Sequence, residues 1–595
     1  MVPIQLTRRW HELPAGSPRL LAFRAICGGS AIVGTYVAAA LGQARHAGWI
    51  AAAIGLPVGI MAALIPRAAP DTFLSCSQSL QSSAPARPRV AFSATGLLAL
   101  LVLLPVVLTK LPAFDDYANY LSHAYIIMRH GHAPLLDQFY SVRWRVVPDL
   151  VLDLVMPPLA SATGLYVSGK LFVVAYMLLL LTGPQALHAA LYRRLSLGPL
   201  VAVPFLYNTI STWGALHYEL GVGLALFGTA AWIAARRAPA MLRGVLLLAS
   251  LLVLFTCHLA AAALYALAIG SYELWRTCSR SIPARQHAGD VLALALPFAA
   301  LAALIVLTPT AGLPAMPWHW GGVHARLDAL RYVVETYYPR LDLLALLTIA
   351  GGLVWAIAAR ALYLPALGWI FLALSGVVFL LTPDTTAGPW RAVPFLPVGV
   401  VFFLIGMLDW NLGSPQRRRN FLLAVVALSV FRMAGVATAF RSFDHIRADF
   451  ERSLPLLTPG SRILVADDYA NQPLDMAPLR GLACLAIIER SSMVSIEYAN
   501  PYKHALVVRS QYRASTGAYD DEPIPLPLLL NPHAFDPQQE SAWFAPSGRL
   551  YWANWVRDYD YVYVMNRANR PSPAPQRLEL IFNGDRFQLF RVKHS

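Results

Sequence analysis

Long apolar runs alternate with short polar segments over the first three quarters of the chain. Several of these runs reach the roughly 20 apolar residues that a helix needs to cross the hydrocarbon core of a bilayer. The pattern predicts about 13 membrane-crossing helices. We place them at residues 20–41, 48–66, 91–109, 166–190, 198–212, 216–235, 241–257, 258–274, 289–308, 341–359, 361–381, 392–408 and 420–438.

The last part of the chain has a different pattern. Its short apolar runs, such as "RILVADD", "ALVVRS" and "YDYVYVMN", are typical of β-strands. The segment "LELIFNGDRFQLFRV" predicts a hairpin, because Asn583-Gly584 suits a type I′ turn between alternating runs. We therefore expect an N-terminal region with two extra helices at 1–90, a transmembrane domain at 91–440, and a small α/β domain at 441–595.

Composition supports a polytopic α-helical membrane protein. Hydrophobic residues make up 57% of the chain and charged residues 13%, whereas soluble domains carry about 25% charged residues. The net charge of +15 is spread over short clusters between apolar runs. We therefore expect no nucleic-acid partner, because such a partner needs a continuous basic face. The five cysteines show neither a zinc-site nor a disulfide pattern.

The basic clusters predict how the chain crosses the membrane. Lys and Arg are enriched in cytoplasmic loops. With a cytoplasmic N-terminus, the clusters in "YRRL", "ARRA" and "QRRRN" all fall on the cytoplasmic side. The long loop at 110–165 and the domain at 441–595 then both lie outside.

The loop at 110–165 begins with two adjacent acids, Asp115 and Asp116, in "KLPAFDDYANYLSH". Apolar residues recur after them at helical spacing, with His123 on another face, which predicts an amphipathic helix along the membrane surface. Further on, "VVPDLVLDLVMPP" predicts a short helix with Asp149 and Asp153 one turn apart on the same face.

Three roles suit the acidic pair. One carboxylate can cap the following helix, which explains one acid better than two. The pair can bind a divalent cation, Mg²⁺ or Mn²⁺, with nearby histidines, although no tight ligand spacing is present. A carboxylate can also act as a general base. That role requires a cation to stabilise a departing phosphate. Arg391 and Lys170 lie near the same surface, where an arginine can equally snorkel without a catalytic role.

Four segments resemble a group of bacterial integral membrane proteins assigned to the GT-C superfamily of membrane glycosyltransferases. They read "FDDYANYLSH", "FYSVRWRVVPDLVLDL", "WGALHYELGVGLAL" and "CLAIIERSSMV". The order of elements is also similar to that superfamily: an apolar helix, a long first outer loop with an acidic pair, many helices and a terminal α/β domain. The resemblance extends loosely over the chain from residue 91.

The resemblance implies a sugar donor linked to polyprenyl phosphate and an inverting transfer to an envelope glycan, lipid or protein. It also implies a bacterial inner membrane and a periplasmic terminal domain. An acid of the first outer loop is the presumed base of the superfamily, which corresponds here to Asp115 or Asp116. Asp116 is preferred because "DYANYL" fits the group best, and Asp153 occupies the later acidic position of the loop. The group tends to have histidine where this chain has Tyr120, so no role is carried over to that position.

Two other residues and two other functions stay open. Glu219 and His258 lie at the outer ends of predicted helices, where each can contact substrate or serve as an ordinary structural group. The chain has no glycine-rich nucleotide loop, which agrees with a lipid-linked donor. A transporter or flippase is one alternative, although no inverted repeat is visible. A non-catalytic scaffold for envelope assembly is the other.

Overall fold

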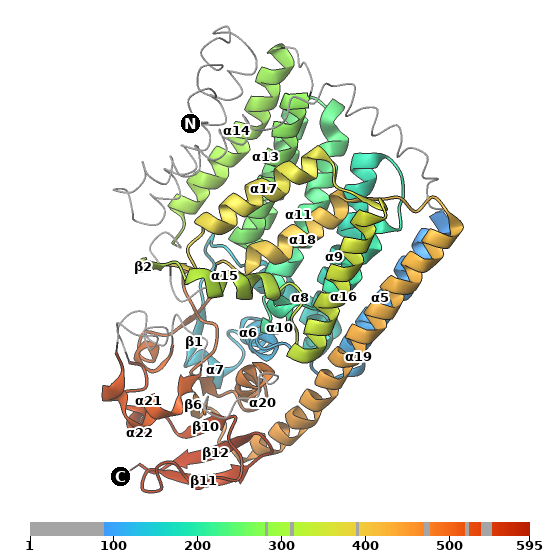
Figure 1. Cartoon of the computed structure of the whole chain (residues 1–595). Coiled ribbons are helices and arrows are strands. Elements are labelled where there is room, and N and C mark those ends of the chain that lie inside the picture. The colour runs from blue at the N-terminus through green and yellow to red at the C-terminus, as the bar shows by residue number, and fades with distance from the viewer. Residues whose placement is uncertain are drawn as a thin grey trace, which may run out of the picture.

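A computed structural model describes residues 88–279, 284–309, 315–387, 392–468, 477–517, 523–536 and 550–594. A bundle of helices forms one part of the molecule, and a smaller domain with a β-sheet packs at one end of it (Figure 1). The two helices predicted at 20–41 and 48–66 lie outside the described residues.

Within the described chain, seven helices are long and apolar enough to cross a membrane, which confirms a polytopic helical protein. The predicted number of about 13 crossings stays a prediction. The seven are α5 (Pro88–Leu108), α9 (Leu165–Tyr192), α11 (Leu216–Ala234), α12 (Ala240–Cys257), α14 (Ala284–Leu307), α16 (Pro339–Ala358) and α19 (Pro415–Ser453). Three further predicted crossings are present as α13 (Leu259–Ser279), α17 (Ala366–Leu381) and α18 (Phe395–Met407).

The crossing predicted at 198–212 is not a continuous α-helix. The chain forms a 3₁₀-helix, η2 (Gly198–Phe205), and then the short helix α10 (Thr209–Trp213). Pro199 and Pro204 lack the N–H group that an α-helix needs, and Pro204 stands inside the run. The prediction of a regular helix is therefore wrong here.

The last crossing is longer than predicted. Helix α19 has 39 residues, which gives a length of about 58 Å at 1.5 Å per residue. It packs against α5 along one edge of the bundle and continues to the C-terminal sheet (Figure 1). Ser453 at its end shares a hydrogen bond with Tyr563 of that sheet (2.7 Å).

The C-terminal sheet contains parallel and antiparallel strands. Its order is β11-β12-β10-β6-β7, with β9 also pairing with β6. Strands β6, β7, β9 and β10 are mutually parallel where they pair, whereas β12 runs antiparallel to β10 and β11. The bounds are β6 (Arg462–Asp467), β7 (Met493–Val494), β9 (Ile524–Pro525), β10 (Tyr561–Met565), β11 (Leu578–Asn583) and β12 (Phe587–Val592).

The predicted hairpin is present, but its turn lies two residues later. The N–H of Gly584 donates to the carbonyl of Phe587 (2.9 Å), so the chain reverses at Asp585 and Arg586. Asn583 stays in the strand because its side chain is held there. Its Oδ1 accepts from the N–H of Asn569 (2.9 Å) and its Nδ2 donates to the side chain of that residue (2.7 Å).

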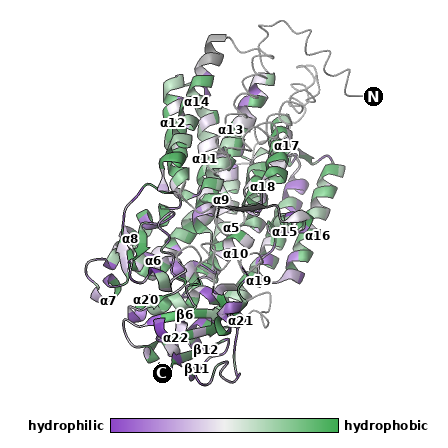
Figure 2. Ribbon diagram, turned by 90° about the vertical axis from the view of Figure 1, so that its left-hand side faces the viewer, coloured by the Kyte–Doolittle hydropathy of each residue, from purple (hydrophilic) through white to green (hydrophobic). Residues whose placement is uncertain are grey.

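The long loop and the C-terminal domain form one packed unit. Strand β1 (Tyr140–Val142) of the loop pairs with β8 (Leu506–Val508) of the domain. Helix α6 (Tyr117–Arg129), predicted to lie along the membrane surface, is instead mostly buried, and it packs against α20 (Leu485–Arg490) of the domain. Hydrophilic residues gather at this end of the molecule, whereas the long helices are largely apolar (Figure 2). Loop and domain therefore share one side of the bundle, and the identity of that side stays a prediction.

An engineered disulfide tests the pairing of β1 with β8. Ser141 lies directly opposite Val507, and opposed residues of an antiparallel pair have Cα atoms about 4.5–5.5 Å apart. We expect the Ser141→Cys/Val507→Cys protein to form an internal disulfide on oxidation, seen as a reduction-sensitive shift on a gel after cleavage between the two positions. Each single variant is the control, and absence of the disulfide would contradict the docking of the domain on the loop.

Candidate active site

The acidic pair lies at the start of α6, on the side where the C-terminal domain packs. Asp116 occupies the N-cap position of the helix, but its side chain makes no capping hydrogen bond. Asp115 and Asp116 are both partly exposed. Helix capping, one of the three roles considered for the pair, is therefore not the role of Asp116 in this structure.

The short helix α10 holds the backbone of the pair. The carbonyl of Thr212 accepts from the N–H of Asp115 (2.9 Å), and that of Trp213 accepts from the N–H of Asp116 (3.2 Å). These carbonyls belong to the last turn of α10, where they have no partner within the helix. The loop therefore takes its position from the transmembrane part of the chain.

Local sequence explains why α10 forms. Asn208 and Ser211 make a reciprocal capping box, in which each side chain accepts a hydrogen bond from the other residue's N–H. The Nδ2 of Asn208 also donates to Oε1 of Glu219 (2.9 Å), which is fully buried in the first turn of α11. The structure thus gives Glu219 a supporting contact with α10, and its predicted contact with substrate stays a prediction.

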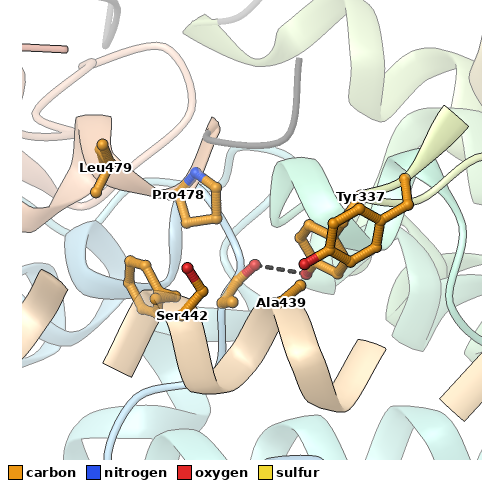
Figure 3. A pocket seen from close by; sticks show the side chains of 8 residues that line it. Tyr337, Ala439, Ser442, Pro478 and Leu479 are labelled. Carbon is orange, nitrogen blue, oxygen red and sulfur yellow. Dashed lines mark hydrogen bonds between the residues drawn. The ribbon is translucent and has the colours of Figure 1, made fainter. Parts of the chain in front are cut away.

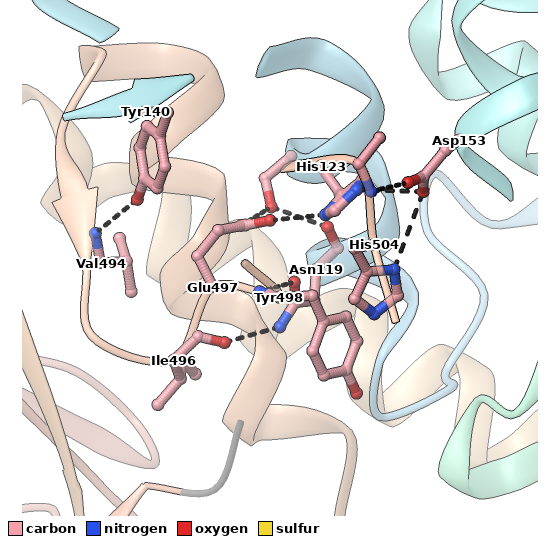
Figure 4. A network of polar contacts seen from close by, with 11 residues as sticks. Asn119, His123, Tyr140, Asp153, Val494, Ile496, Glu497, Tyr498 and His504 are labelled. Carbon is pink, nitrogen blue, oxygen red and sulfur yellow. Dashed lines mark hydrogen bonds and ion pairs between the residues drawn. The ribbon is translucent and has the colours of Figure 1, made fainter. Parts of the chain in front are cut away.

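A buried network of charged groups joins α6 to the C-terminal domain (Figure 4). His123 lies between two carboxylates. Its Nε2 is 3.0 Å from Oδ1 of Asp153, and its Nδ1 is 3.3 Å from Oε1 of Glu497. The hydroxyl of Ser122 donates to Oε2 of Glu497 (2.5 Å), and the N–H of Ala505 donates to Oδ2 of Asp153 (2.7 Å).

Helical spacing brings these side chains to one face of α6. Ser122 and His123 follow Asn119 by three and four residues, so the three side chains lie toward the same side of the helix. Asn119 binds the backbone of the C-terminal domain through both amide atoms: it donates to the carbonyl of Ile496 (2.7 Å) and accepts from the N–H of Tyr498 (3.1 Å). The domain therefore covers the polar face of the predicted amphipathic helix.

The network holds His123 in its charged form. Burial alone would lower its pKa, but the charge and hydrogen bond of Asp153, with those of Glu497, raise the pKa to about 10. Burial likewise opposes ionisation of Asp153, yet the charge and hydrogen bond of His123, with those of His504, leave its pKa below the usual range. An imidazolium therefore lies between two acids at this junction.

A second polar cluster lies beside the first. Ligand-type atoms of Asp149, His217 and His258 lie within 4.8 Å of one another. The two imidazole rings have their centroids 5.2 Å apart. The ammonium group of Lys503, from the C-terminal domain, is 3.9 Å from Oδ2 of Asp149. The cluster thus combines one carboxylate with one ammonium group and two imidazole rings.

Tyr120 connects this cluster with the acidic pair. Its hydroxyl is 3.2 Å from Nδ1 of His217. Its backbone N–H donates to the carbonyl of Asp116 in the first turn of α6 (3.0 Å). One helical turn and one tyrosine side chain therefore separate the acidic pair from the histidines.

Asp149 and Asp153 do not share a helix face as predicted. Helix α8 (Val151–Thr163) begins after Asp149, whose φ of 65° is left-handed. Asp149 therefore faces His217 and Lys503, whereas Asp153 faces His123. The two acids serve different clusters.

Of the two predicted phosphate-binding residues, the structure describes Lys170 but not Arg391. Arg391 lies outside the described residues. The chain is described again from residue 392, and the ring of Phe395 is 4.9 Å from that of His258. Lys170 is partly buried on α9 and donates to the carbonyl of Val107 at the end of α5 (3.2 Å). Lys170 thus contacts the end of α5.

Two clusters in the described chain have side chains of the kind that bind metal ions, and neither includes Asp115 or Asp116. The cluster of His123, Asp153 and His504 does not suit a metal as arranged, because both ring nitrogens of His123 already contact carboxylates, Nε2 that of Asp153 and Nδ1 that of Glu497.

In the second cluster, His217 could ligate through Nε2, with Tyr120 orienting its other nitrogen. However, Nδ1 of His258 accepts from the N–H of Ala260 (3.0 Å), so the neutral ring carries its proton on Nε2. Lys503 also balances the charge of Asp149 already. The residues as arranged do not fit a resident cation, so we derive no step through one, and the expectation of Mg²⁺ or Mn²⁺ stays a prediction.

Sequence reasoning missed four residues of these clusters. His217 lies in the segment "WGALHYELG", and Glu497, Lys503 and His504 lie in "SIEYANPYKHAL". The signal was the unusual density of charged and aromatic residues in the second segment. Their proximity to α6 depends on contacts between positions more than 350 residues apart, such as Ser122 with Glu497, which spacing along the chain does not reveal.

Comparisons with known proteins give a distant structural likeness. No protein-family model matches the sequence, and a search of curated proteins finds no match. The chain is similar to ArnT from Cupriavidus metallidurans in the apo state, with 13% identity and a TM-score of 0.44 over 84% of this chain and 99% of that chain. For ArnT bound to undecaprenyl phosphate the values are 12%, 0.45, 86% and 99%. Both likenesses are distant.

The charged state of His123 predicts a pH-dependent stability. Its pKa is raised from 6.5 to about 10 on folding, so its contribution is complete below pH 6.5 and is lost as the pH rises toward 10. We expect the midpoint of thermal unfolding to fall over this range. His123→Gln should remove that part of the fall, because the variant has no proton to lose.

His130→Gln is the matched control, because His130 ends the same helix but is far more exposed. It should keep the slope of the wild-type protein. An unchanged slope in His123→Gln would show that another group titrates.

Proposed function

We propose that the protein is a membrane glycosyltransferase that moves a sugar from polyprenyl phosphate to an acceptor of the cell envelope. The observation that carries the proposal is the link through Tyr120. It joins two partly exposed carboxylates with the cluster of Asp149, His217, His258 and Lys503. General base and phosphate-binding groups are the two requirements of this chemistry. The sequence motifs that resemble the GT-C superfamily support the same reaction.

The proposed reaction is a single displacement with inversion. A carboxylate oxygen of Asp116 takes the proton of the acceptor hydroxyl, and the acceptor oxygen bonds to the anomeric carbon. The bond between that carbon and the phosphate oxygen breaks, and polyprenyl phosphate leaves with the bonding electrons. The ammonium group of Lys503 stabilises the negative charge of the phosphate, and the neutral imidazole rings of His217 and His258 donate N–H hydrogen bonds to it. Asp115 supports Asp116 by its neighbouring charge, which favours proton uptake.

The donor and acceptor meet at the membrane surface in this proposal. The polyprenyl chain lies in the bilayer beside the apolar helices, and the sugar reaches the clusters at their outer ends. The acceptor is an envelope glycan, lipid or protein. We propose a bacterial inner membrane, with the C-terminal domain in the periplasm, because the basic clusters of the sequence fall on the opposite side.

Substitution of the acids tests the proposal. The full chain in lipid nanodiscs is supplied with a panel of polyprenyl-phosphate hexoses and pentoses and an envelope extract as acceptor, and release of polyprenyl phosphate is measured. We expect Asp116→Asn to lower turnover by about 10²–10⁴-fold, the usual contribution of a general base. The affinity for the donor should stay within about twofold, because Asn keeps the size of the side chain, whereas Lys503→Ala should weaken donor binding.

Asp328→Asn is the control, because Asp328 is an exposed acid of α15 (Gly322–Arg331). It should turn over like the wild-type protein. Normal turnover in the Asp115→Asn/Asp116→Asn double variant would refute the assignment of the base. No turnover of any donor by the wild-type protein would favour a flippase, tested by movement of a labelled lipid across the bilayer, or a scaffold.

A further inference from the structure

Two glycines from opposite parts of the chain touch the backbone of the acidic pair. Gly214 ends α10 in the transmembrane part, and Gly481 lies in η7 (Ala477–Cys484) of the C-terminal domain. Gly214 contacts Asp116, and Gly481 contacts Asp115. The pair is therefore enclosed between two backbones, and each contact depends on the absence of a side chain.

The contact at Gly214 cannot accommodate a larger residue. A Cβ added there would lie 2.8 Å from both Cβ and N of Asp116. The φ of Gly214 is also +94°, a conformation that L-residues with a side chain rarely adopt. Either effect would displace Asp116 or unwind the end of α10.

Helix α10 has little freedom to move away from the pair. Its capping box is buried, and Asn208 is tied to Glu219 of α11. The N–H of Thr209 donates to the carbonyl of Tyr332 (3.0 Å), which connects α10 with the segment before α16. A clash at Gly214 would therefore fall on Asp116 rather than on α10.

The contact at Gly481 is closer still. A Cβ added there would lie 2.3 Å from the carbonyl oxygen of Asp115. The neighbouring Arg480 has its Nε 3.8 Å from Oδ2 of Asp467, which is fully buried at the end of β6. The position of Gly481 thus follows from the C-terminal sheet.

A small pocket opens at the same junction (Figure 3). Ala113, two residues before Asp115, and Tyr337 line one side, and their hydrogen bond between the tyrosine hydroxyl and the carbonyl of Ala113 measures 2.6 Å. Pro478 and Leu479 of η7 line the other side. Pro478 and Leu479 of η7 therefore lie across this small pocket from Ala113, close to the acidic pair.

We propose that Gly214 and Gly481 are positioning residues that fix the carboxylates of Asp115 and Asp116 by direct backbone contact. The C-terminal domain then supplies one wall of the active site, in addition to covering α6. We call these two glycine contacts with Asp115 and Asp116 the clamp. The side chain of Asp116 makes no capping hydrogen bond to α6. This inference rests on the proposed role of the pair as a base.

Alanine substitution at the two glycines tests the clamp in the full chain, with the polyprenyl-phosphate donors described above. We expect Gly214→Ala and Gly481→Ala each to lower kcat at least tenfold, because a base displaced by about 1 Å loses its alignment. The KM for the donor should stay within about twofold. The acidic limb of the pH–rate profile should move, since the surroundings of the carboxylates change.

Two control variants separate positioning from stability. Gly183→Ala crowds Leu226 in the helix bundle, with a Cβ 2.9 Å from that side chain, so it matches the steric cost away from the acids. Gly376→Ala meets nothing within 4 Å. Both should keep the kcat and the pH profile of the wild-type protein when activity is expressed per folded molecule. Size-exclusion chromatography and thermal unfolding measure the folded fraction of each variant.

The outcomes separate the two proposals. If Gly214→Ala and Gly481→Ala are destabilised like Gly183→Ala but keep kcat and the pH profile, the clamp is refuted while the glycosyltransferase proposal stands. If the wild-type protein turns over no donor, both proposals fall. If the Asp115→Asn/Asp116→Asn double variant keeps its turnover, the assignment of the base and the clamp both fall, while the transfer reaction itself stands. A loss of kcat with a shifted pH profile in the two glycine variants alone supports the clamp.

Discussion

The burial of His123 between two carboxylates is the interaction on which the rest of the site depends. Asp153 comes from the long loop and Glu497 from the C-terminal domain, so the charged ring joins two parts of the chain that meet only in the folded protein. A charged side chain that is buried away from water is stable only when partner groups replace its hydrogen bonds to water. Removing one partner of a buried ion pair costs about 3–5 kcal/mol. The domain must therefore dock in one register on α6, and that register places Lys503 and Gly481 at their positions.

Side chains and backbone have different roles at this junction. The buried ion network fixes where the domain sits, and the glycine contacts transmit that position to the acidic pair at distances where no side chain fits. A junction made only of flexible surface ion pairs would not define the carboxylates so closely, because exposed pairs contribute little and move easily. The arrangement explains why a chain with so few charged residues concentrates several of them at one end of its helices.

The sequence predicted the elements better than their contacts. Long apolar runs marked α5, α9, α11, α12 and α16 to within a few residues, because each run is continuous and has the length of a bilayer. Short apolar runs also marked β6, β8, β10, β11 and β12, whereas β7 and β9, with two residues each, were not predicted. The polar face of α6 was misjudged, because Asn119 and His123 are covered by residues nearly 380 positions away. The acids of the site were visible as a pair, whereas His217 and Lys503 join them only through the fold.

The end of α10 at Gly214 has a consequence for the site. In a continuous helix, the carbonyls of Thr212 and Trp213 would accept hydrogen bonds from residues one turn later. Because α10 ends at Gly214, these two carbonyls are available to the N–H groups of Asp115 and Asp116. Irregular backbone at membrane depth is stable only where its polar groups are satisfied within the protein. The end of α10 at Gly214 thus leaves free the two acceptors that hold the acidic pair.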